Sequence, residues 1–399
     1  MVRNSKAVDE IYFRKVETKM KEMNVFADDF LISFAEEGDL LHFLRQRTRT
    51  SGWIRQPVKK LRLLPLAEEK VQQTLTKETE TGKIIDDTMK HTQMMLKIEQ
   101  GYYPVRDCAI HTILTRAGIK GEALKRLSPK NYAKIVNMCL QTAKGKALIR
   151  FADGKISAVH GGDENDYRIL DTEQIFMETI FYLQQNFPGT KYIPESGYYD
   201  HSSVTAMWEL AGKPELLETY QEALENYGVK RKAYAPALRL STSDVGAKSV
   251  TLHQMLLCGG NTREINLGYP IRLTHSGKAD MNAFRKNLDL ICVRYKEAIG
   301  SLAKLLTIPV RHPVNCMIGM MKTLKIPRKI GNQAVELFIA QNGEGCTTAH
   351  EIYYALNETI FFSACEGKQG SQLLKLEEQL MRVLHFDWEY YDVAGNVSW

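Results

Sequence analysis

The acidic residues that could form a metal-dependent hydrolytic site lie between residues 195 and 209. Glu195, Asp200 and His201 fall on an expected β-hairpin, and Glu209 lies on its second strand. Carboxylates gathered in this way can hold a divalent cation that activates water, as in a nuclease. The common carboxylate-and-lysine nucleases also have a lysine two residues beyond an acid on the same strand, and Glu209-Leu-Ala-Gly has none. Polar residues that face solvent on a hairpin explain this segment better.

The chain contains none of the short motifs that mark a metal, nucleotide or acyl-transfer site. It has no C-x-x-C or H-E-x-x-H pair for zinc, and no G-x-x-x-x-G-K-[ST] or strand-linked G-x-G-x-x-G for phosphates. The nucleophile elbow G-x-S-x-G is also missing. Gly343-Glu-Gly345 precedes an expected helix and could hold an anion, but a turn between helices is the simpler explanation. We therefore expect no cofactor, no metal and no catalytic residue, and the sequence favours a binding protein over an enzyme.

The basic residues form a stronger pattern than the acidic ones. Residues 42–62 carry seven positive charges, no negative charge and one tryptophan. Cations next to phosphates release counterions, and an aromatic ring can stack on an unpaired base at roughly 1–3 kcal/mol per base. We therefore predict a nucleic-acid-binding loop here, together with a second basic cluster near residue 231. The predicted binding residues are Arg45, Arg47, Arg49, Trp53, Arg55, Lys59, Lys60, Arg62, Lys230, Arg231 and Lys232.

A third basic cluster lies between residues 120 and 134, where Glu122 is the only opposing acid. Its members are Lys120, Lys125, Arg126, Lys130 and Lys134. For all three clusters the alternative is a solvated surface, because the chain as a whole has a net charge of only +6.

The centre of the chain changes from helical to alternating periodicity, which predicts an antiparallel β-rich module. Lys146–Phe151 and Lys155–His160 flank an Asp153-Gly154 turn, a strong hairpin pattern. Residues 191–210 predict a second hairpin. Further strands are expected at 237–243, 249–258 and 269–274, with a turn at Asp244-Val-Gly246 between the first two.

Helical periodicity on both sides of this centre predicts an α+β fold, with a central antiparallel β-rich module flanked by N-terminal and C-terminal helical regions. The expected domains are a helical N-terminal region at 1–144 with the basic loop at 42–62, a β-rich α+β core at 145–306 and a helical C-terminal region at 307–399. Helices are expected at 5–23, 27–37, 67–99, 105–117, 129–144, 171–186, 214–227, 283–306, 314–324, 328–341, 348–365 and 371–385. The aromatic tail, residues 387–399, is expected to pack back on the body.

The composition is that of an ordinary globular protein, with 399 residues of which 44% are hydrophobic and 25% charged. No run of 18 apolar residues predicts a membrane span, and the charged N-terminus lacks the apolar core of a signal peptide. The seven cysteines are odd in number and widely spaced, which is typical of reduced thiols. We therefore expect a cytoplasmic protein that does not associate with membranes.

The central block resembles a known family in the order of its short motifs. Ser243-Asp244-Val245-Gly246 forms a small-residue turn, Cys258-Gly-Gly-Asn261-Thr262 ends the following strand, and His275-Ser276 ends the next, before a long helix. This order is similar to the phage/plasmid-like domain of unknown function family numbered 932 in its series, which occurs on mobile elements. The chain departs from that pattern by an extra glycine between Cys258 and Asn261. The resemblance implies a phage or plasmid context, and it transfers neither an activity nor catalytic residues.

Three functions remain open from the sequence. The leading one is a mobile-element protein that binds nucleic acid as a homo-oligomer, and its most concrete version is a single-stranded DNA binding or annealing protein in recombination. The second is a protein–protein interaction or defence and counter-defence factor, in which the basic residues contact an acidic nuclease or polymerase. The third is the metal-dependent nuclease built on Glu195, Asp200 and Glu209.

Overall fold

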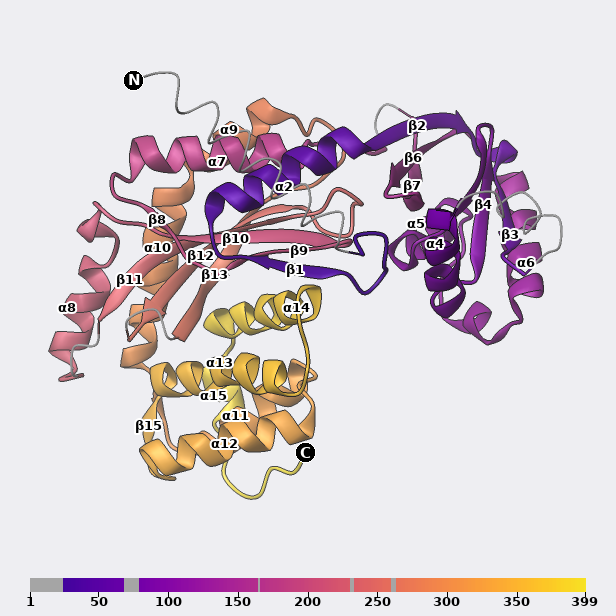
Figure 1. Cartoon of the computed structure of the whole chain (residues 1–399). Coiled ribbons are helices and arrows are strands. Elements are labelled where there is room, and N and C mark those ends of the chain that lie inside the picture. Colours follow the sequence, from indigo (N-terminus) through magenta and orange to yellow (C-terminus); the bar gives the residue numbers. More distant parts are fainter. Residues whose placement is uncertain (1–23, 68–78, 164–165, 230–232, 260–262) are drawn as a thin grey trace, which may run out of the picture. The chain divides into compact units, whose positions relative to one another are not determined.

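The computed structural model describes residues 24–67, 79–163, 166–229, 233–259 and 263–399 (Figure 1). The chain divides into two compact units, and neither is continuous in sequence. Unit 1 consists of residues up to Ile32, Phe43–Ile169 and Val245–Ala247, whereas unit 2 consists of Ser33–His42, Leu170–Asp244 and Lys248–Trp399. Residues 145–169, which the sequence analysis places with the central core, therefore belong to unit 1. The helix expected at 5–23 lies outside the described residues.

Unit 1 contains two three-stranded antiparallel sheets, with strand orders β2-β6-β7 and β3-β4-β5. Their strands are β2 (Ser51–Pro57), β3 (Arg62–Pro65), β4 (Met94–Ile98), β5 (Gly101–Pro104), β6 (Lys146–Ala152) and β7 (Lys155–Gly161). The helical elements are α4 (Thr79–Lys90), α5 (Asp107–Arg116), α6 (Pro129–Thr142) and the short 3-10 turns η1 (Val58–Lys60) and η2 (Ala123–Arg126). Helix α2 (Glu37–Thr50) begins in unit 2 and ends in unit 1.

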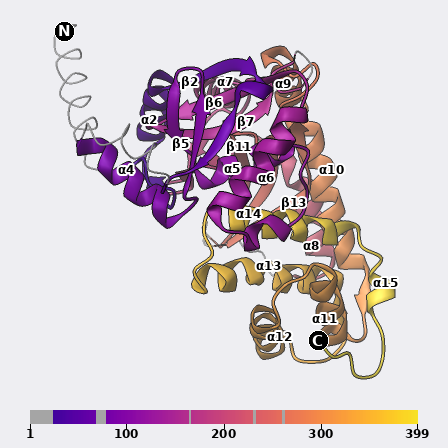
Figure 2. The same ribbon diagram turned by 90° about the vertical axis from the view of Figure 1, so that its right-hand side faces the viewer.

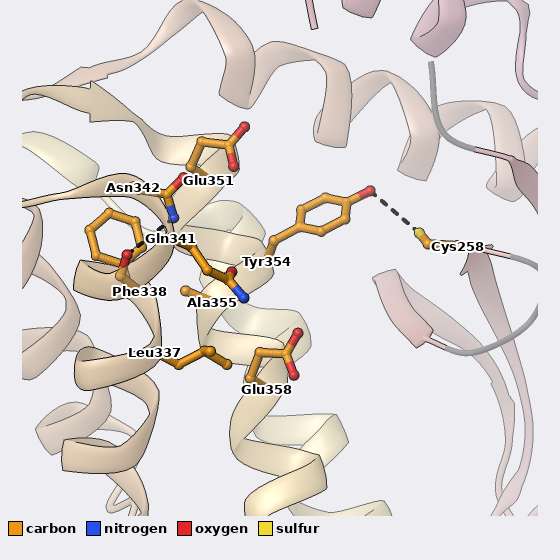
Figure 3. A pocket seen from close by; sticks show the side chains of 10 residues that line it. Cys258, Leu337, Phe338, Gln341, Asn342, Glu351, Tyr354, Ala355 and Glu358 are labelled. Atoms are coloured by element: carbon orange, nitrogen blue, oxygen red, sulfur yellow. Dashed lines mark hydrogen bonds between the residues drawn. The ribbon is translucent and has the colours of Figure 1, made fainter. Parts of the chain in front are cut away.

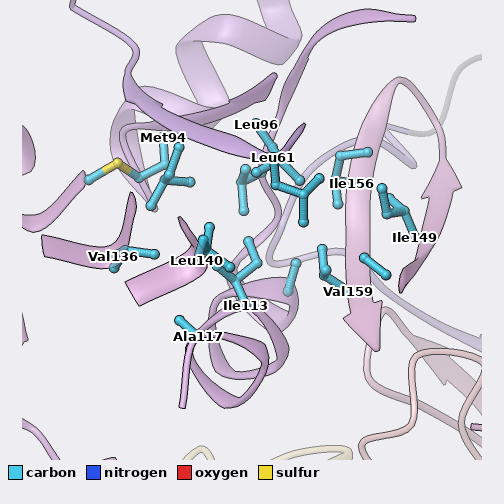
Figure 4. Close-up of a cluster of buried hydrophobic side chains, with 14 of the residues drawn as sticks. Leu61, Met94, Leu96, Ile113, Ala117, Val136, Leu140, Ile149, Ile156 and Val159 are labelled. Atoms are coloured by element: carbon cyan, nitrogen blue, oxygen red, sulfur yellow. The ribbon is translucent and has the colours of Figure 1, made fainter. Parts of the chain in front are cut away.

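The core of unit 1 is formed by apolar side chains from both sheets and from helices α5 and α6 (Figure 4). On α6, Val136 and Leu140 are fully buried because their spacing of four residues places them on one face of the helix. The helix starts as expected, since the Ser128 side chain accepts a hydrogen bond from the Asn131 N–H and Pro129 occupies the first turn. Residues from the two sheets complete the cluster: Leu61, Leu63, Met94, Leu96, Ile149, Ile156 and Val159.

The hairpin expected at residues 146–160 is confirmed as β6 and β7, which pair antiparallel. Asp153 and Gly154 occupy its turn with φ angles of 49° and 74°. Positive φ at both central turn residues matches the right-handed twist of the strands, and Asp-Gly tolerates it well. Local turn chemistry therefore fixes this part of the sheet.

The N-terminal region differs from the expected run of helices in three places. Instead of a helix at 27–37, residues Leu31–Phe34 form strand β1, because the Phe34 carbonyl accepts hydrogen bonds from the Glu195 N–H and the Tyr192 hydroxyl. Residues 42–62 are not a loop, since they run from α2 into β2 and η1. Of the helix expected at 67–99, the described residues retain only α4, and β4 follows it. In each case pairing with a distant segment overrides the local pattern.

Unit 2 is built on a seven-stranded sheet with the order β1-β9-β10-β11-β12-β13, in which β8 also pairs with β10. The neighbouring strands β8 and β10, β9 and β10, β10 and β11, β11 and β12, and β12 and β13 all pair antiparallel. This sheet and its flanking helices confirm the α+β class, the hairpin expected within residues 191–210 and the three further strands. The strands are β8 (Lys191–Tyr192), β9 (Gly197–Asp200), β10 (Ser203–Glu209), β11 (Tyr234–Thr242), β12 (Val250–Cys258) and β13 (Arg263–Leu273).

Helices cover the sheet of unit 2 and form a C-terminal group, in which α11, α12 and α13 pack together (Figure 2). The Tyr295 hydroxyl of α10 donates to the carbonyl of Met255 in β12, and the Tyr353 hydroxyl of α13 donates to that of Asn266 in β13. The sequence analysis expects one helix over 283–306, but the structure divides it at Leu290. The helices of unit 2 are α7 (Thr172–Asn186), α8 (Glu218–Asn226), α9 (Met281–Asp289), α10 (Ile291–Lys304), α11 (Pro313–Thr323), α12 (Arg328–Asn342), α13 (Ala349–Cys365), α14 (Ser371–Leu380) and α15 (Trp388–Tyr391).

The aromatic tail packs back on the C-terminal helices, as expected. The Lys322 ammonium donates to the Ser398 carbonyl at 2.9 Å, and the Asn315 amide donates to the carbonyls of Val393 and Gly395. The Trp399 ring lies over Gly331 of α12 so closely that a Cβ atom there would overlap it.

Candidate nucleic-acid interface

Two stretches of unit 1 that are nearly free of acidic residues lie side by side in the fold. Residues 42–62 contain no acid, and residues 120–150 contain eight cations and only Glu122. Strand β2 of the first stretch pairs along its whole length with β6 of the second, from Ser51↔Ala152 to Pro57↔Lys146. The sequence analysis identified residues 42–62 and the cluster at 120–134 as basic, and the structure adds Lys144, Lys146 and Arg150, which lie on or beside the strand that pairs with β2.

Further contacts hold these two stretches together beyond the strand pair. The Val58 N–H donates to the Gly145 carbonyl, and the Asn137 side chain of α6 exchanges two hydrogen bonds of 2.7 Å with the backbone of Leu63. The Gln141 amide, one turn further along α6, donates to the Lys59 carbonyl. The backbone positions of both stretches are therefore fixed relative to one another.

Five exposed cations cluster where β2, η1 and β6 meet, and we call them the basic junction. They are Arg55, Lys59, Lys60, Lys144 and Lys146. Lys60 pairs with Glu99 at 2.5 Å, and both side chains are exposed to solvent, so solvent and salt weaken this pair. Because Pro57 lies opposite Lys146, the side chains of Arg55 and Lys146 project from the same face of the sheet. Cations gathered in this way produce a positive potential that attracts polyanions.

The same face of the β2-β6-β7 sheet carries an aromatic group beside the basic junction. Arg150 lies opposite Trp53, and its guanidinium carbon is 5.3 Å from the centre of the Trp53 ring. The ring of Tyr167 lies 5.5 Å from Trp53 and stacks on His160 at 3.9 Å with parallel planes. Trp53 is half-buried within this group, so it supports the aromatic group and is not the freely exposed stacking ring expected from the sequence.

Not every predicted binding residue is free to meet a phosphate. Arg47 is buried and forms an ion pair with Asp153 at the β6–β7 turn. The Arg62 guanidinium donates to the backbone carbonyls of Lys59 and Leu61, which stabilises η1. Arg45 is half-buried, whereas Arg49 is exposed at the end of α2. The cluster Lys230, Arg231 and Lys232 lies outside the described residues.

The third basic cluster lies on η2 and α6 of unit 1. Lys130 and Lys134 are both exposed one helical turn apart, whereas Lys125 pairs with Glu122 at 2.6 Å. The same side of α6 exposes Met138, with 63% of its surface accessible. This cluster extends the positive region along α6 and mixes it with apolar surface.

A buried set of charges in unit 1 was not anticipated from the sequence. The Lys155 ammonium has no exposed surface and contacts Asp28 at 2.8 Å and also Asp87, while Arg106 contacts Asp28 at 3.3 Å and Asp153 at 3.6 Å. These ion pairs join Asp28, near the start of the described chain, to helix α4, to Arg106 at the start of α5 and to the β6–β7 hairpin. Single charged residues far apart in sequence gave no local pattern that could have revealed the group.

This buried set contains the only possible metal ligands that come together among the described residues. Oxygen or nitrogen atoms of Asp28, Asp87 and His91 lie within 4.8 Å of one another. The donor set does not fit a metal ion, however, because Lys155 and Arg106 already neutralise the two carboxylates. A divalent cation would have to displace the lysine or add charge to a balanced group.

Asp200 and Glu209, two of the three carboxylates considered for a nuclease, lie at opposite ends of β10. Asp200 closes the β9–β10 turn by accepting three hydrogen bonds of 2.7 Å from Ser202 and Ser203. Glu209 lies at the other end of β10, opposite Lys191, six residues from the pair of Asp200 and Ser203. At about 3.3 Å per residue this separation is roughly 20 Å.

Two of the cavities formed by the described residues bear on ligand binding. One, in unit 1, has a volume of 370 Å³ and is lined by α5 and by two members of the aromatic group, His160 and Tyr167. The other, in unit 2, has a volume of 490 Å³ and lies beside Tyr354, whose hydroxyl points toward Cys258 (Figure 3). Its charged lining residues are the carboxylates Glu351 and Glu358, which repel phosphates. The cavity of unit 1 is therefore the one that suits nucleic acid.

The tyrosines beside the unit 2 cavity form a hydrogen-bonded group with a histidine. The Tyr220 hydroxyl lies 2.7 Å from His350 Nε2 and 2.8 Å from the Tyr354 hydroxyl. Burial raises the pKa of Tyr220 and that of Tyr354 above the usual value of 10, so both phenols stay protonated at neutral pH. This hydrogen-bonded group joins α8 to α13.

No family model, curated protein or solved structure matches the chain. The resemblance to the phage/plasmid-like family therefore stays a prediction. Among the described residues, no helix is both long and apolar enough to cross a membrane.

Proposed function

We propose that this chain binds single-stranded nucleic acid, with DNA as the expected polymer, through the face of unit 1 that carries the basic junction. The observation that supports this function best is the strand pairing of two nearly acid-free stretches, residues 42–62 and 120–150. Folding places their cations together although like charges repel, and such an arrangement is typical of a surface that binds a polyanion.

The neighbouring aromatic group favours a single strand over a duplex. Its rings lie on a sheet face and beside a cavity, and unpaired bases can reach such places whereas bases inside a duplex cannot. The resemblance to mobile-element proteins adds a context in recombination or strand annealing. Assembly into a homo-oligomer would extend the phosphate contacts along a strand, and it is part of the same proposal.

Salt dependence provides the direct test of this proposal. Affinity for a fluorescent oligothymidylate should fall with rising salt, with a slope of roughly 0.7 for each phosphate contact in a plot of log affinity against log salt concentration. A variant with Arg55→Gln, Lys59→Gln and Lys146→Gln should bind more weakly at low salt. Its slope should be smaller by about 2, because three contacts are lost.

A matched control removes exposed cations of unit 2. Lys296→Gln with Lys304→Gln changes two exposed residues of α10 and should leave both the affinity and the slope nearly unchanged. Wild-type protein that shows no affinity for single strands at low salt would exclude the proposal. Equal losses in the two variants would instead indicate attraction by net charge alone, without an interface on unit 1.

The second candidate is an interaction with an acidic protein, and the exposed side of α6 favours it. Met138 and Ile135 are accessible there, beside Lys130 and Lys134. Exposed apolar residues contribute little to phosphate binding, but they are common in the centre of protein interfaces. A stoichiometric protein partner that stays bound after nuclease treatment, and is lost in Met138→Glu, would favour this function.

A further inference from the structure

The cavity of 370 Å³ in unit 1 is large enough for a small ligand group, since such sites occupy roughly 300–1,000 Å³. Helix α5 forms one wall with His111, Thr115 and Arg116. The end of β7 and Tyr167 form the opposite wall. Both walls belong to unit 1, and so does Gly246, which completes the lining.

Contacts with neighbouring aromatic rings and with Gly246 fix the two rings that line this cavity. His160 and Tyr167 stack with parallel rings at 3.9 Å, and the ring of Trp53 lies 5.5 Å from Tyr167. Gly246 has a φ of 70°, and a Cβ atom there would lie 2.6 Å from His160. Only glycine therefore lets the chain approach these rings so closely. Tyr167 itself is buried, with 9% of its surface exposed, so a nucleobase would stack on the part of this fixed ring pair that lines the cavity.

The polar side of the cavity offers both a donor and an acceptor. The Arg116 Nε atom is buried and has no hydrogen-bond partner among the described residues, although its Nη2 atom donates to the Lys144 carbonyl. Asp166 contributes a carboxylate to the same lining. A buried donor without a partner is unfavourable, and an acceptor on a ligand would offset that cost. Arginine donates to O6 and N7 of guanine, and a carboxylate accepts from amino groups of bases.

Arg116 also connects this cavity to the basic junction. Its hydrogen bond reaches the carbonyl of Lys144, which is itself a member of the junction, and Lys146 follows two residues later. A strand whose phosphates contact the junction therefore has a base within reach of the cavity. Thr115 lies at the edge of the cavity, and its hydroxyl is already bonded to the His111 carbonyl of its own helix.

We propose that this cavity binds one unpaired guanine base of a single strand whose phosphates lie on the basic junction. This inference rests on the proposed function and adds base selectivity to it. Stacking on the aromatic wall supplies affinity for any base, whereas Arg116 and Asp166 distinguish guanine from adenine and from the pyrimidines.

The test uses the full chain and four short oligothymidylates that differ only at the central position, which is G, A, C or T. One good contact to a base edge usually discriminates against the wrong base by about fivefold or more in affinity. Wild-type protein should therefore bind the G-containing strand at least about fivefold more tightly than the other three. Thr115→Leu places a larger side chain in the cavity without removing a fold contact beyond its own helix. This variant should bind all four strands alike.

Thr50→Leu is the matched control. Thr50 is also exposed near a helix end, and its hydroxyl also bonds a carbonyl four residues earlier, but it does not line the cavity. It should retain the preference for guanine. A second measurement needs no variant, since 2-aminopurine at the central position should lose fluorescence by stacking in the wild-type cavity, and excess G-containing strand should restore it.

The outcomes separate this inference from the proposed function. Salt-sensitive binding that is equal for the four strands, or a guanine preference that survives Thr115→Leu, would overturn the guanine cavity and leave the basic junction intact. Absence of binding to every strand would overturn both. A preference that Thr115→Leu abolishes and Thr50→Leu retains would establish the cavity as the base site.

Discussion

Lys155 donates to both Asp28 and Asp87 from a side chain that has no exposed surface. The three residues come from the start of the described chain, helix α4 and strand β7, so one ammonium group joins three segments. Arg106 and Arg47 extend the same group through Asp28 and Asp153. Cations of the protein itself therefore neutralise these carboxylates. Two predictions depend on this balance of charge.

Replacing Lys155 by methionine should destabilise unit 1 by about 3–5 kcal/mol, because it leaves two buried carboxylates with only part of their compensation. The free energy of unfolding can be followed by urea denaturation monitored at unit 1, since the chain as a whole need not unfold in one step. Lys83→Met, an exposed change on α4, should cost almost nothing. Equal stability of the two variants would show that the buried pairs contribute little.

Divalent cations should leave the wild-type unfolding transition unchanged but stabilise Lys155→Met. Once the ammonium is gone, Asp28, Asp87 and His91 remain within 4.8 Å of one another with an excess of negative charge. We therefore expect Mn²⁺ to raise the unfolding midpoint of this variant, and the added change Asp87→Asn to cancel that effect. Stabilisation of the wild-type protein by Mn²⁺ would contradict this account and point to a natural metal site.

His253 should make unit 2 less stable as the pH falls below about 6.5. Burial lowers the pKa of this histidine well below 6.5, and the cations Arg239, Lys248 and Arg272 lower it further. Glu377 and Glu264 also face this region, but both pair with Arg239. The unfolded chain therefore binds a proton at His253 below pH 6.5 while the folded chain does not, and folding loses about 1.4 kcal/mol per pH unit until the folded pKa is reached.

The measurement is the free energy of unfolding of unit 2 at several pH values between 7 and 5. His253→Gln should show a shallower decline than wild type, because it cannot take up the proton. His111→Gln, which changes an exposed histidine of unit 1, should follow the wild-type curve. Parallel curves for wild type and His253→Gln would rule out this histidine as the source of the pH dependence.

Gly246→Ala should destabilise unit 1 more than an equivalent change in open space. Its Cβ atom would lie 2.6 Å from His160 and 2.9 Å from Tyr167, and its φ of 70° already disfavours a side chain. Gly118→Ala has almost the same φ, 71°, but meets no atom within 4 Å. The difference between the two variants in thermal unfolding isolates the packing cost, which we expect to be about 1–3 kcal/mol.

The sequence predicted those parts of the fold that local chemistry determines. Asp153-Gly154 specified a hairpin, Ser128-Pro129 a helix start, and Asp171 the beginning of α7, where its side chain accepts the Gln174 N–H. The strand β2 was missed because its partner β6 lies far along the chain, and no local pattern in residues 51–57 indicates which segment will pair with it.

The candidate site was predictable in its charge but not in its geometry. A count of acids and bases identified residues 42–62 and 120–134 as basic, whereas only the fold shows that Lys146 and Arg150 lie on the strand that pairs with β2. Arg47 shows what the sequence alone could not predict. It is buried in an ion pair with Asp153, which lies more than a hundred residues away in the chain. The cavity gave no signal in the sequence, since Arg116, Tyr167 and Gly246 belong to separate segments and each is unremarkable by itself.

The interleaving of the two units has a consequence for how the chain is made. Ser33–His42 of unit 2 is synthesised before Phe43–Ile169 of unit 1, and Val245–Ala247 of unit 1 follows Leu170–Asp244 of unit 2. During translation, β2 has no partner until the ribosome has passed residue 152, and the wall of the cavity at Gly246 is added later still. A growing chain therefore has its basic residues 42–62 long before the cavity is complete, and no single cut in the gene would release either unit whole.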